Sequence, residues 1–273
     1  MPLRGNSKAY TLFNAGLKQQ YDDRLDDAKD SYREAMQKGC IQAAVNLGTL
    51  MVDGTDADKM NAKETFQWAA DRGDGSGCRN LAYMYAIGLC VPKDKEKAVE
   101  YYRKAAELGN IKAQCNLAVM YRHGNGTPIN YEQAAEWYKR SAEGGYFRAQ
   151  ASLADMYLLG QGVERDPEKA FYWYTKAADN GSSRGMYNLA LMYLNGVYTD
   201  KDEDKAAGLL NAAIQQGYSK AMFVMGQLLE DKGCMPEAMN LYLSGAAKKE
   251  PRCVKRLEEF GSGADHNASV KHS

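Results

Sequence analysis

A serine motif in the second half of the chain comes nearest to a catalytic signature. Residues 181–185 read Gly-Ser-Ser-Arg-Gly and match Gly-x-Ser-x-Gly, the pattern of a nucleophile elbow. An elbow needs a strand before the serine, but a helical pattern precedes this one, and both glycines recur along the chain. The chain contains no Ser-x-x-Lys and no Gly-x-x-x-x-Gly-Lys-Ser/Thr phosphate loop. We therefore predict no enzyme activity, no catalytic residue and no cofactor.

Residues that ligate metals are scattered rather than clustered. The three histidines are His123, His266 and His272, and the six cysteines form no Cys-x-x-Cys pair. Zinc sites need ligands at short spacing, so no metal site is predicted. The first residues lack the apolar stretch of a secretory signal, which predicts reduced thiols and a cytoplasmic location. The cysteines are Cys40, Cys78, Cys90, Cys115, Cys234 and Cys253.

Two series of polar side chains recur at regular spacing and offer binding chemistry. A basic ladder at intervals of 36 residues would attract acidic segments or a terminal carboxylate, unless it is only a solvated surface. An amide ladder, with Ser152 filling one gap, would bond to a peptide backbone or equally to neighbouring loops of the same protein. The basic ladder is Lys112, Arg148, Arg184 and Lys220; the amide ladder is Asn46, Asn80, Asn116 and Asn188.

These ladders belong to a repeat that runs through most of the chain. Its clearest column is glycine, at intervals of 34 and then 36 residues: Gly39, Gly73, Gly109, Gly145, Gly181 and Gly217. A second column holds Leu47, Leu81, Leu117, Leu153, Leu189 and Met225, each followed by Gly or Ala. A third holds Tyr32, Phe66, Tyr102, Tyr138, Tyr174, Leu210 and Tyr242. The abundant tyrosines are therefore interpreted mainly as packing residues between repeats.

Each repeat has the spacing of two short helices. Ala113, Leu117 and Tyr121 recur at i, i+4 and i+8, and Ala134, Tyr138 and Ala142 form a second such stripe. Asp or Asn precedes the second helix as an expected N-cap, at Asp58, Asp94, Asn130, Asp166 and Asp202. The glycine column closes that helix, where a left-handed residue is favoured. A helix pair cannot bury both of its faces alone, so the pairs must stack.

The columns resemble the SLR (Sel-one-like repeat) family, a relative of the tetratricopeptide repeat. Between Ala149 and Gly181 the family pattern is nearly complete, and the likeness covers residues 40–249. It implies an all-α fold: a right-handed superhelical α/α solenoid of six to seven helix-turn-helix repeats. Some secreted, cysteine-rich relatives have been assigned β-lactamase or penicillin-binding activity, but their regular cysteine pairs are missing from this chain.

We expect one solenoid domain over residues 7–260. The predicted units are 7–39, 40–73, 74–109, 110–145, 146–181, 182–217 and 218–249, followed by a last helix over 251–260. The first and last units depart from the pattern, as capping repeats do. A flexible segment is expected at residues 1–6 and a disordered tail at 261–273, where apolar residues are few.

The preferred function is a non-enzymatic scaffold or adaptor that binds proteins or peptides, including acidic segments, in a concave groove. The chain has 35 basic and 35 acidic residues, so no general attraction to nucleic acid is expected. No apolar run is long enough for membrane insertion. Two alternatives stay open: a hydrolase of β-lactams or cell-wall peptides, by family analogy, and a subunit that self-assembles through its ends.

Overall fold

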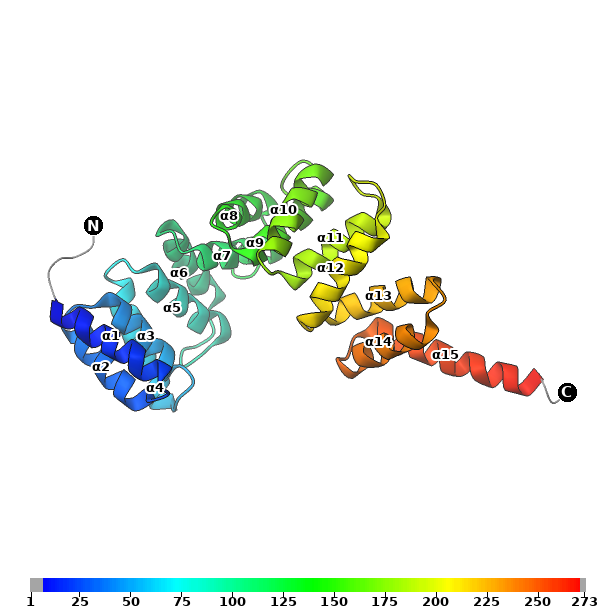
Figure 1. Ribbon diagram of the computed structural model, residues 1–273. Helices are drawn as coiled ribbons and strands as arrows, with labels where there is room; N and C mark the ends of the chain where they lie inside the picture. Colours follow the sequence, from blue (N-terminus) through cyan, green and yellow to red (C-terminus); the bar gives the residue numbers. More distant parts are fainter. Residues whose placement is uncertain (1–6, 271–273) are drawn as a thin grey trace. The chain divides into compact units, whose positions relative to one another are not determined.

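The computed structural model describes residues 7–270, with side chains over residues 8–261, and contains only helices in that range (Figure 1). Consecutive helices pair, and the first member of each pair carries an odd number. The chain divides into two compact units, Met1–Gly144 and Gly145–Ser273, whereas the sequence predicted a single domain. The helices of the first unit are α1 (Ser7–Tyr21), α2 (Leu25–Gln37), α3 (Ile41–Met51), α4 (Asp56–Ala70), α5 (Gly75–Ile87), α6 (Lys95–Glu107), α7 (Ile111–His123) and α8 (Tyr131–Glu143).

The second unit repeats the same design. Every helix from α5 to α14 has 13 residues, and each of the seven predicted ranges contains one helix pair. The all-α repeat fold expected from the sequence is thereby confirmed. The helices are α9 (Phe147–Leu159), α10 (Pro167–Asp179), α11 (Ser183–Asn195), α12 (Glu203–Gln215), α13 (Ser219–Asp231), α14 (Met235–Ala247) and α15 (Pro251–Val270).

Side-chain caps and glycines set the helix ends. Asp94, Asn130, Asp166 and Asp202 are N-caps, each accepting a bond from the backbone N–H three residues on. The predicted cap at Asp58 is wrong. Thr55 caps α4, and Asp58 is the third helical residue, where its carboxylate bonds back to the Thr55 N–H in a capping box. That helix begins earlier because its connecting loop is shorter.

Small residues on the odd-numbered helices let the paired helix approach closely. A Cβ added to Gly48 would lie 2.5 Å from the Phe66 ring, and one added to Gly226 would lie equally close to Tyr242. The aromatic column fills the space beside these small residues, and its members are among the largest fully buried side chains. This close packing accounts for the alternation of small and aromatic columns in the sequence.

The C-terminal helix differs from the expected boundary. The last helix was predicted to end at residue 260, but α15 continues to Val270, and no proline follows Pro251 to end it earlier. Of the predicted disordered tail, residues 271–273 lie outside the described range. The segment at residues 1–6 also lies outside it.

Candidate functional site

One side of each odd-numbered helix carries both predicted ladders. Four positions, at i, i+4, i+7 and i+11, share that side because an α-helix repeats every 3.6 residues. In α7 these positions are Lys112, Asn116, Val119 and His123, and in α9 they are Arg148, Ser152, Asp155 and Leu159. We call the equivalent side of α1, α3, α5, α7, α9, α11 and α13 the ladder face, and we treat it separately in the two units.

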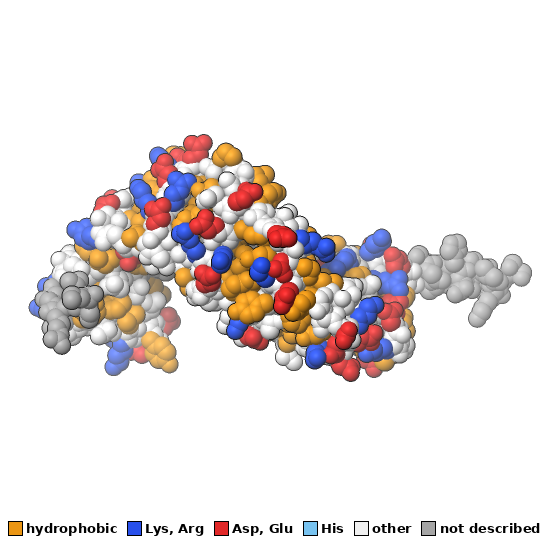
Figure 2. Space-filling view, turned by 90° about the horizontal axis from the view of Figure 1, so that it is seen from above, with side chains coloured by type: hydrophobic (Ala, Val, Ile, Leu, Met, Phe, Trp, Pro, Cys, Tyr) orange, Lys and Arg blue, Asp and Glu red, His pale blue; other side chains and the backbone are white. Residues whose placement is uncertain are grey.

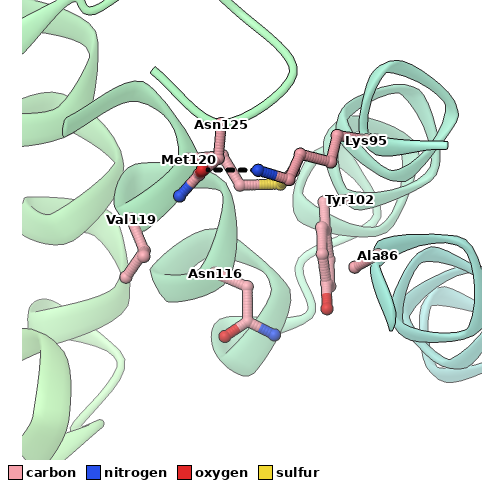
Figure 3. Close-up of a pocket in the computed structure, with 7 residues that line it drawn as sticks. All are labelled: Ala86, Lys95, Tyr102, Asn116, Val119, Met120 and Asn125. Carbon is pink, nitrogen blue, oxygen red and sulfur yellow. Dashed lines mark hydrogen bonds between the residues drawn. The ribbon is translucent and has the colours of Figure 1, made fainter. Parts of the chain in front are cut away.

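The amide ladder serves the buried tyrosine column. The Asn46 amide donates to the Tyr32 hydroxyl at 3.4 Å, and Asn116 lines the same pocket as Tyr102 (Figure 3). Tyr102 is only 4% exposed, and burial raises the pKa of its hydroxyl to about 12, although the Asn116 amide opposes the rise. Of the two roles left open for the amides, Asn46 therefore has the structural one at least.

A polar side chain stands 14 residues after each buried tyrosine of the column. Tyr138 has Ser152 at that position, Tyr174 has Asn188 and Tyr242 has Arg256. Leu210, which has no hydroxyl, is matched instead by the apolar Val224. This spacing is the sequence signal that would have linked the amide ladder to the tyrosine column.

Asn80 is the exception, since the aromatic residue 14 positions before it is Phe66. Its amide oxygen accepts a bond of 2.8 Å from the Arg79 guanidinium. Asn80 thus lies on the ladder face of α5 without a tyrosine hydroxyl to bind.

Arg184 of the basic ladder belongs to a polar cluster in the second unit. Asp155 accepts bonds from the Arg184 guanidinium, the Tyr174 hydroxyl and the Asn188 amide. Arg184 also donates to the Ser152 hydroxyl at 3.3 Å. Burial, reinforced by the adjacent Asp155 carboxylate, raises the pKa of Tyr174. Sequence reasoning missed Asp155, although it occupies a ladder-face position.

The other three basic residues are exposed. Lys112 lies on the first unit, while Arg148 and Lys220 lie on the second. The Arg148 guanidinium stands 6.0 Å from the centre of the Phe147 ring. The four basic residues are therefore not equivalent, because the guanidinium of Arg184 is bound to Asp155.

A similar polar cluster joins α13, α14 and α15 at the C-terminal end of the second unit. The Tyr242 hydroxyl donates to Glu230 at 2.9 Å, and the Arg256 guanidinium donates to the same carboxylate from α15. Hydrogen bonding to Arg256 lowers the pKa of Glu230, whereas burial raises that of Tyr242. Glu230 and Arg256 were not predicted as site residues.

Two pockets open beside the ladder face of the first unit. Leu17, Gln20, Tyr21, Asn46 and Thr49 line one of about 460 Å³, between α1 and α3. The other, of about 330 Å³, lies among α5, α6 and α7 and includes Tyr102, Asn116 and Val119 (Figure 3). At its edge Lys95 donates to Asn125 at 3.1 Å. Sequence reasoning did not find these pockets, although the exposed apolar residues recur at helical spacing.

The serine motif does not form a nucleophile elbow. Ser183 is the first residue of α11 and follows another helix rather than a strand. Ser182 caps α11 by accepting a bond of 3.1 Å from the Gly185 N–H. Both serines therefore serve the start of α11, Ser182 as its N-cap and Ser183 as its first residue.

Among the described side chains, no group of three or more His, Cys, Asp or Glu residues could hold a metal ion. None of the six cysteines, all within the described range, forms a disulfide. His123 is exposed at the end of α7. On the face seen in Figure 2, acidic and basic side chains are interspersed with apolar ones. Among the described helices, none combines the length and apolar character needed to cross a membrane.

Stacked pairs of short helices, with small and aromatic columns at their contacts, define an α-helical repeat protein of the solenoid class. The sequence profile of the Sel1 repeat matches residues 75–110, 111–146, 147–182 and 183–218. The chain belongs to the Sel1 repeat family, as the resemblance in the sequence indicated. No curated protein matches it significantly.

Solved structures agree with this assignment. The c5321 protein, a protective antigen of uropathogenic Escherichia coli strains with an SLR fold, aligns with a TM-score of 0.78 and 28% identity, over 92% of this chain and 56% of that one. This chain thus spans little more than half the length of that antigen. A Sel1 repeat protein of Oxalobacter formigenes has a TM-score of 0.75 and 24% identity, over 86% and 96% of the two chains. The Pseudomonas aeruginosa immunity protein Pa5087 shares the fold at a TM-score of 0.50 and 20% identity, over 77% and 82%.

Proposed function

We propose that the protein is a non-enzymatic scaffold that binds segments of partner proteins on its ladder faces. Repeat solenoids of this class are typical protein-interaction folds, because stacked repeats create an extended surface rather than one enclosed pocket. The observation that carries the proposal is the ladder face itself. It is a regular surface of basic, amide and apolar side chains, parts of which stay exposed after the repeats have packed together.

The second unit is suited to acidic segments. Arg148 and Lys220 are exposed at the same position of α9 and α13, and Arg184 occupies that position on α11. Arg184 keeps 43% of its side chain exposed although it is paired with Asp155, so it still contributes positive charge at the surface. Carboxylates of a partner would form charge-assisted hydrogen bonds with these groups.

The test is a fluorescence titration of the whole protein with a labelled peptide rich in Asp and Glu. The variant Arg148→Glu with Lys220→Glu should bind the peptide about tenfold more weakly. Arg184 is left unchanged, because its substitution would break the contact with Asp155. The matched control is Lys176→Glu with Lys255→Glu, which changes the net charge equally through exposed residues outside the ladder face.

Equal loss of affinity in both variants would contradict a localised acidic-segment site. Equal binding by all three proteins would remove the basic ladder from the proposal. Raising the salt concentration should weaken specific binding, because exposed charges are screened.

A further inference from the structure

The ladder face of the first unit exposes an unusual number of apolar side chains. Tyr83 and Ile87 of α5 are 50% and 49% exposed, and Tyr21 of α1 is 91% exposed. Leu17 and Val119 add to the same face. Exposed apolar side chains are unremarkable singly, but their gathering on one face marks a surface for interaction.

The two pockets described above lie within that surface. One is walled by Leu17 and Tyr21, and the other by Val119 and Met120. Each also has one ladder amide in its lining, Asn46 in the first and Asn116 in the second. Each pocket therefore combines room for one large side chain with an amide beside it.

The charge of this face restricts what it can bind. Of the ladder-face positions on α1, α3, α5 and α7, counted through Asp53 just after α3, only Asp53 and Lys112 carry a formal charge. Two further cations lie beside these positions: Lys95 lines the second pocket, and Arg79 is bonded to Asn80. In the second unit, the twelve positions on α9, α11 and α13 include five charged residues: Arg148, Asp155, Arg184, Lys220 and Asp231. A charged partner segment would lose its hydration on the first unit and gain few ion pairs, because Lys95 is already bonded to Asn125 and Arg79 to Asn80. The complementary partner is uncharged.

The amides select the backbone conformation of that partner. A carboxamide has two N–H donors and two acceptor lone pairs, and at Asn46 the bond to Tyr32 uses only one of them. Capacity therefore remains at Asn46 and Asn116 for the N–H and C=O groups of a bound chain. An extended segment offers such groups, whereas a helix has already satisfied its own.

The repeat sets the spacing of the two anchors. The pockets lie at the α1–α3 and α5–α7 positions, two repeats apart. Neighbouring helices pack at about 8–10 Å, so the separation is about 16–20 Å. An extended chain rises about 3.3 Å per residue and covers that separation in five to six residues. Six keeps both side chains on the same face, because side chains alternate along an extended chain.

We infer that the ladder face of the first unit binds an extended, uncharged segment of a partner protein that carries two large apolar side chains six residues apart. The side chains occupy the two pockets, and Asn46, Asn80 and Asn116 bond to the intervening backbone. This inference rests on the proposed scaffold function and assigns a separate class of partner to the first unit.

The test uses the whole protein and an array of synthetic peptides. Each peptide has a background of Ser, Thr and Asn with two Leu or two Trp residues, separated by two to ten positions. A parallel set replaces part of the background with Asp and Glu. Binding should be strongest in the uncharged set at a separation of six, and it should be nearly independent of salt.

The site variant is Leu17→Gln with Val119→Asp. These residues already stand at the same positions in α13 and α9, as Gln227 and Asp155, so the repeat accommodates them. The variant should bind the uncharged peptides about tenfold or more weakly. The control is Leu159→Asp, which changes a ladder-face residue of the second unit that is 60% exposed, and it should bind them like the unaltered protein.

The possible failures are distinguishable. Binding confined to the acidic set, and unaffected by the site variant, would overturn this inference while leaving the scaffold function in place. Equal weakening by Leu159→Asp would also overturn it, because the site would not be confined to the first unit. Absence of binding to every peptide would overturn both the inference and the proposed peptide-binding function.

Discussion

At the scale of single residues, the buried tyrosine hydroxyls organise the polar side chains between repeats. A buried hydroxyl without a partner is costly, so the buried tyrosines bond to side chains of the odd-numbered helices beside them. Tyr32 bonds to Gln20 of α1 and Asn46 of α3, and Tyr242 bonds to Glu230 of α13. Leu210 with Val224 shows the apolar replacement. An amide at this position therefore reflects packing first, and partner binding uses what remains of its hydrogen-bonding capacity.

The Tyr102–Asn116 pair can be tested by a double-mutant cycle. Asn116→Val alone should lower the free energy of unfolding by about 1–2 kcal/mol, because it removes the amide that interacts with the buried Tyr102 hydroxyl. Adding Tyr102→Phe should recover about 1 kcal/mol of this loss, since the pair then becomes apolar like Leu210 and Val224. Urea denaturation followed by circular dichroism provides the measurement. Strictly additive effects would show that the two side chains are not coupled.

The raised pKa of Tyr102 predicts a loss of stability in alkali. Its pKa is about 12 in the folded protein against 10.0 for the unperturbed group, so the unfolded chain releases the proton first as pH rises. The stabilisation is complete below about pH 10 and is lost as pH rises towards 12, by up to about 3 kcal/mol. Urea denaturation of the Tyr102→Phe variant should therefore show a shallower fall of stability over this range. Parallel pH profiles for the two proteins would exclude Tyr102 as a contributor.

At the scale of helices, turn and cap residues made the repeat predictable from sequence. The glycines between repeats have positive φ, for example +83° at Gly109 and +81° at Gly181, which other residues adopt only with strain. Asp and Asn caps mark where most second helices begin. Side-chain contacts between different helices were not predictable in the same way. The contacts of Asp155 with Arg184 and Tyr174 join α9, α10 and α11, and no local pattern connects those three residues.

Replacing glycine by alanine should have opposite effects on stability at Gly109 and at Gly208. Gly109→Ala should destabilise the protein by about 1 kcal/mol, because its φ of +83° is unfavourable for a residue with a Cβ. Gly208 lies inside α12, and a Cβ added there would meet no atom within 4 Å. Gly208→Ala should therefore stabilise by about 0.5–1 kcal/mol through its higher helix propensity. Thermal melts of the two variants compare the predictions directly, and a shift in the same direction would contradict them.

At the scale of the whole molecule, the repeat count followed from the sequence but the division into two units did not. The columns continue without interruption past Gly144 and Gly145. They reflect the packing within each helix pair and not the strength of the contacts between successive pairs, so they do not mark the boundary between the units. Each unit nevertheless has buried clusters of its own, around Tyr32, Phe66 and Leu81 in the first and around Tyr174 and Leu210 in the second. The chemistry of the ladder face follows the same division, mainly uncharged on one unit and charged on the other.

The separate clusters predict that each unit folds by itself. In repeat proteins, stability comes from the repeats and from contacts with immediate neighbours, so a fragment that keeps whole repeats keeps most of its stabilising contacts. Residues 1–144 and residues 145–273, expressed separately, should each give a helical circular dichroism spectrum and a cooperative urea transition. The control is a fragment of residues 1–126, which removes α8 and exposes the buried Leu117 and Met120 of α7. That fragment should be clearly less stable than residues 1–144, because the apolar face of α7 loses its partner helix. If residues 1–144 unfold without cooperativity while the whole chain unfolds in one transition, the two units depend on each other for folding.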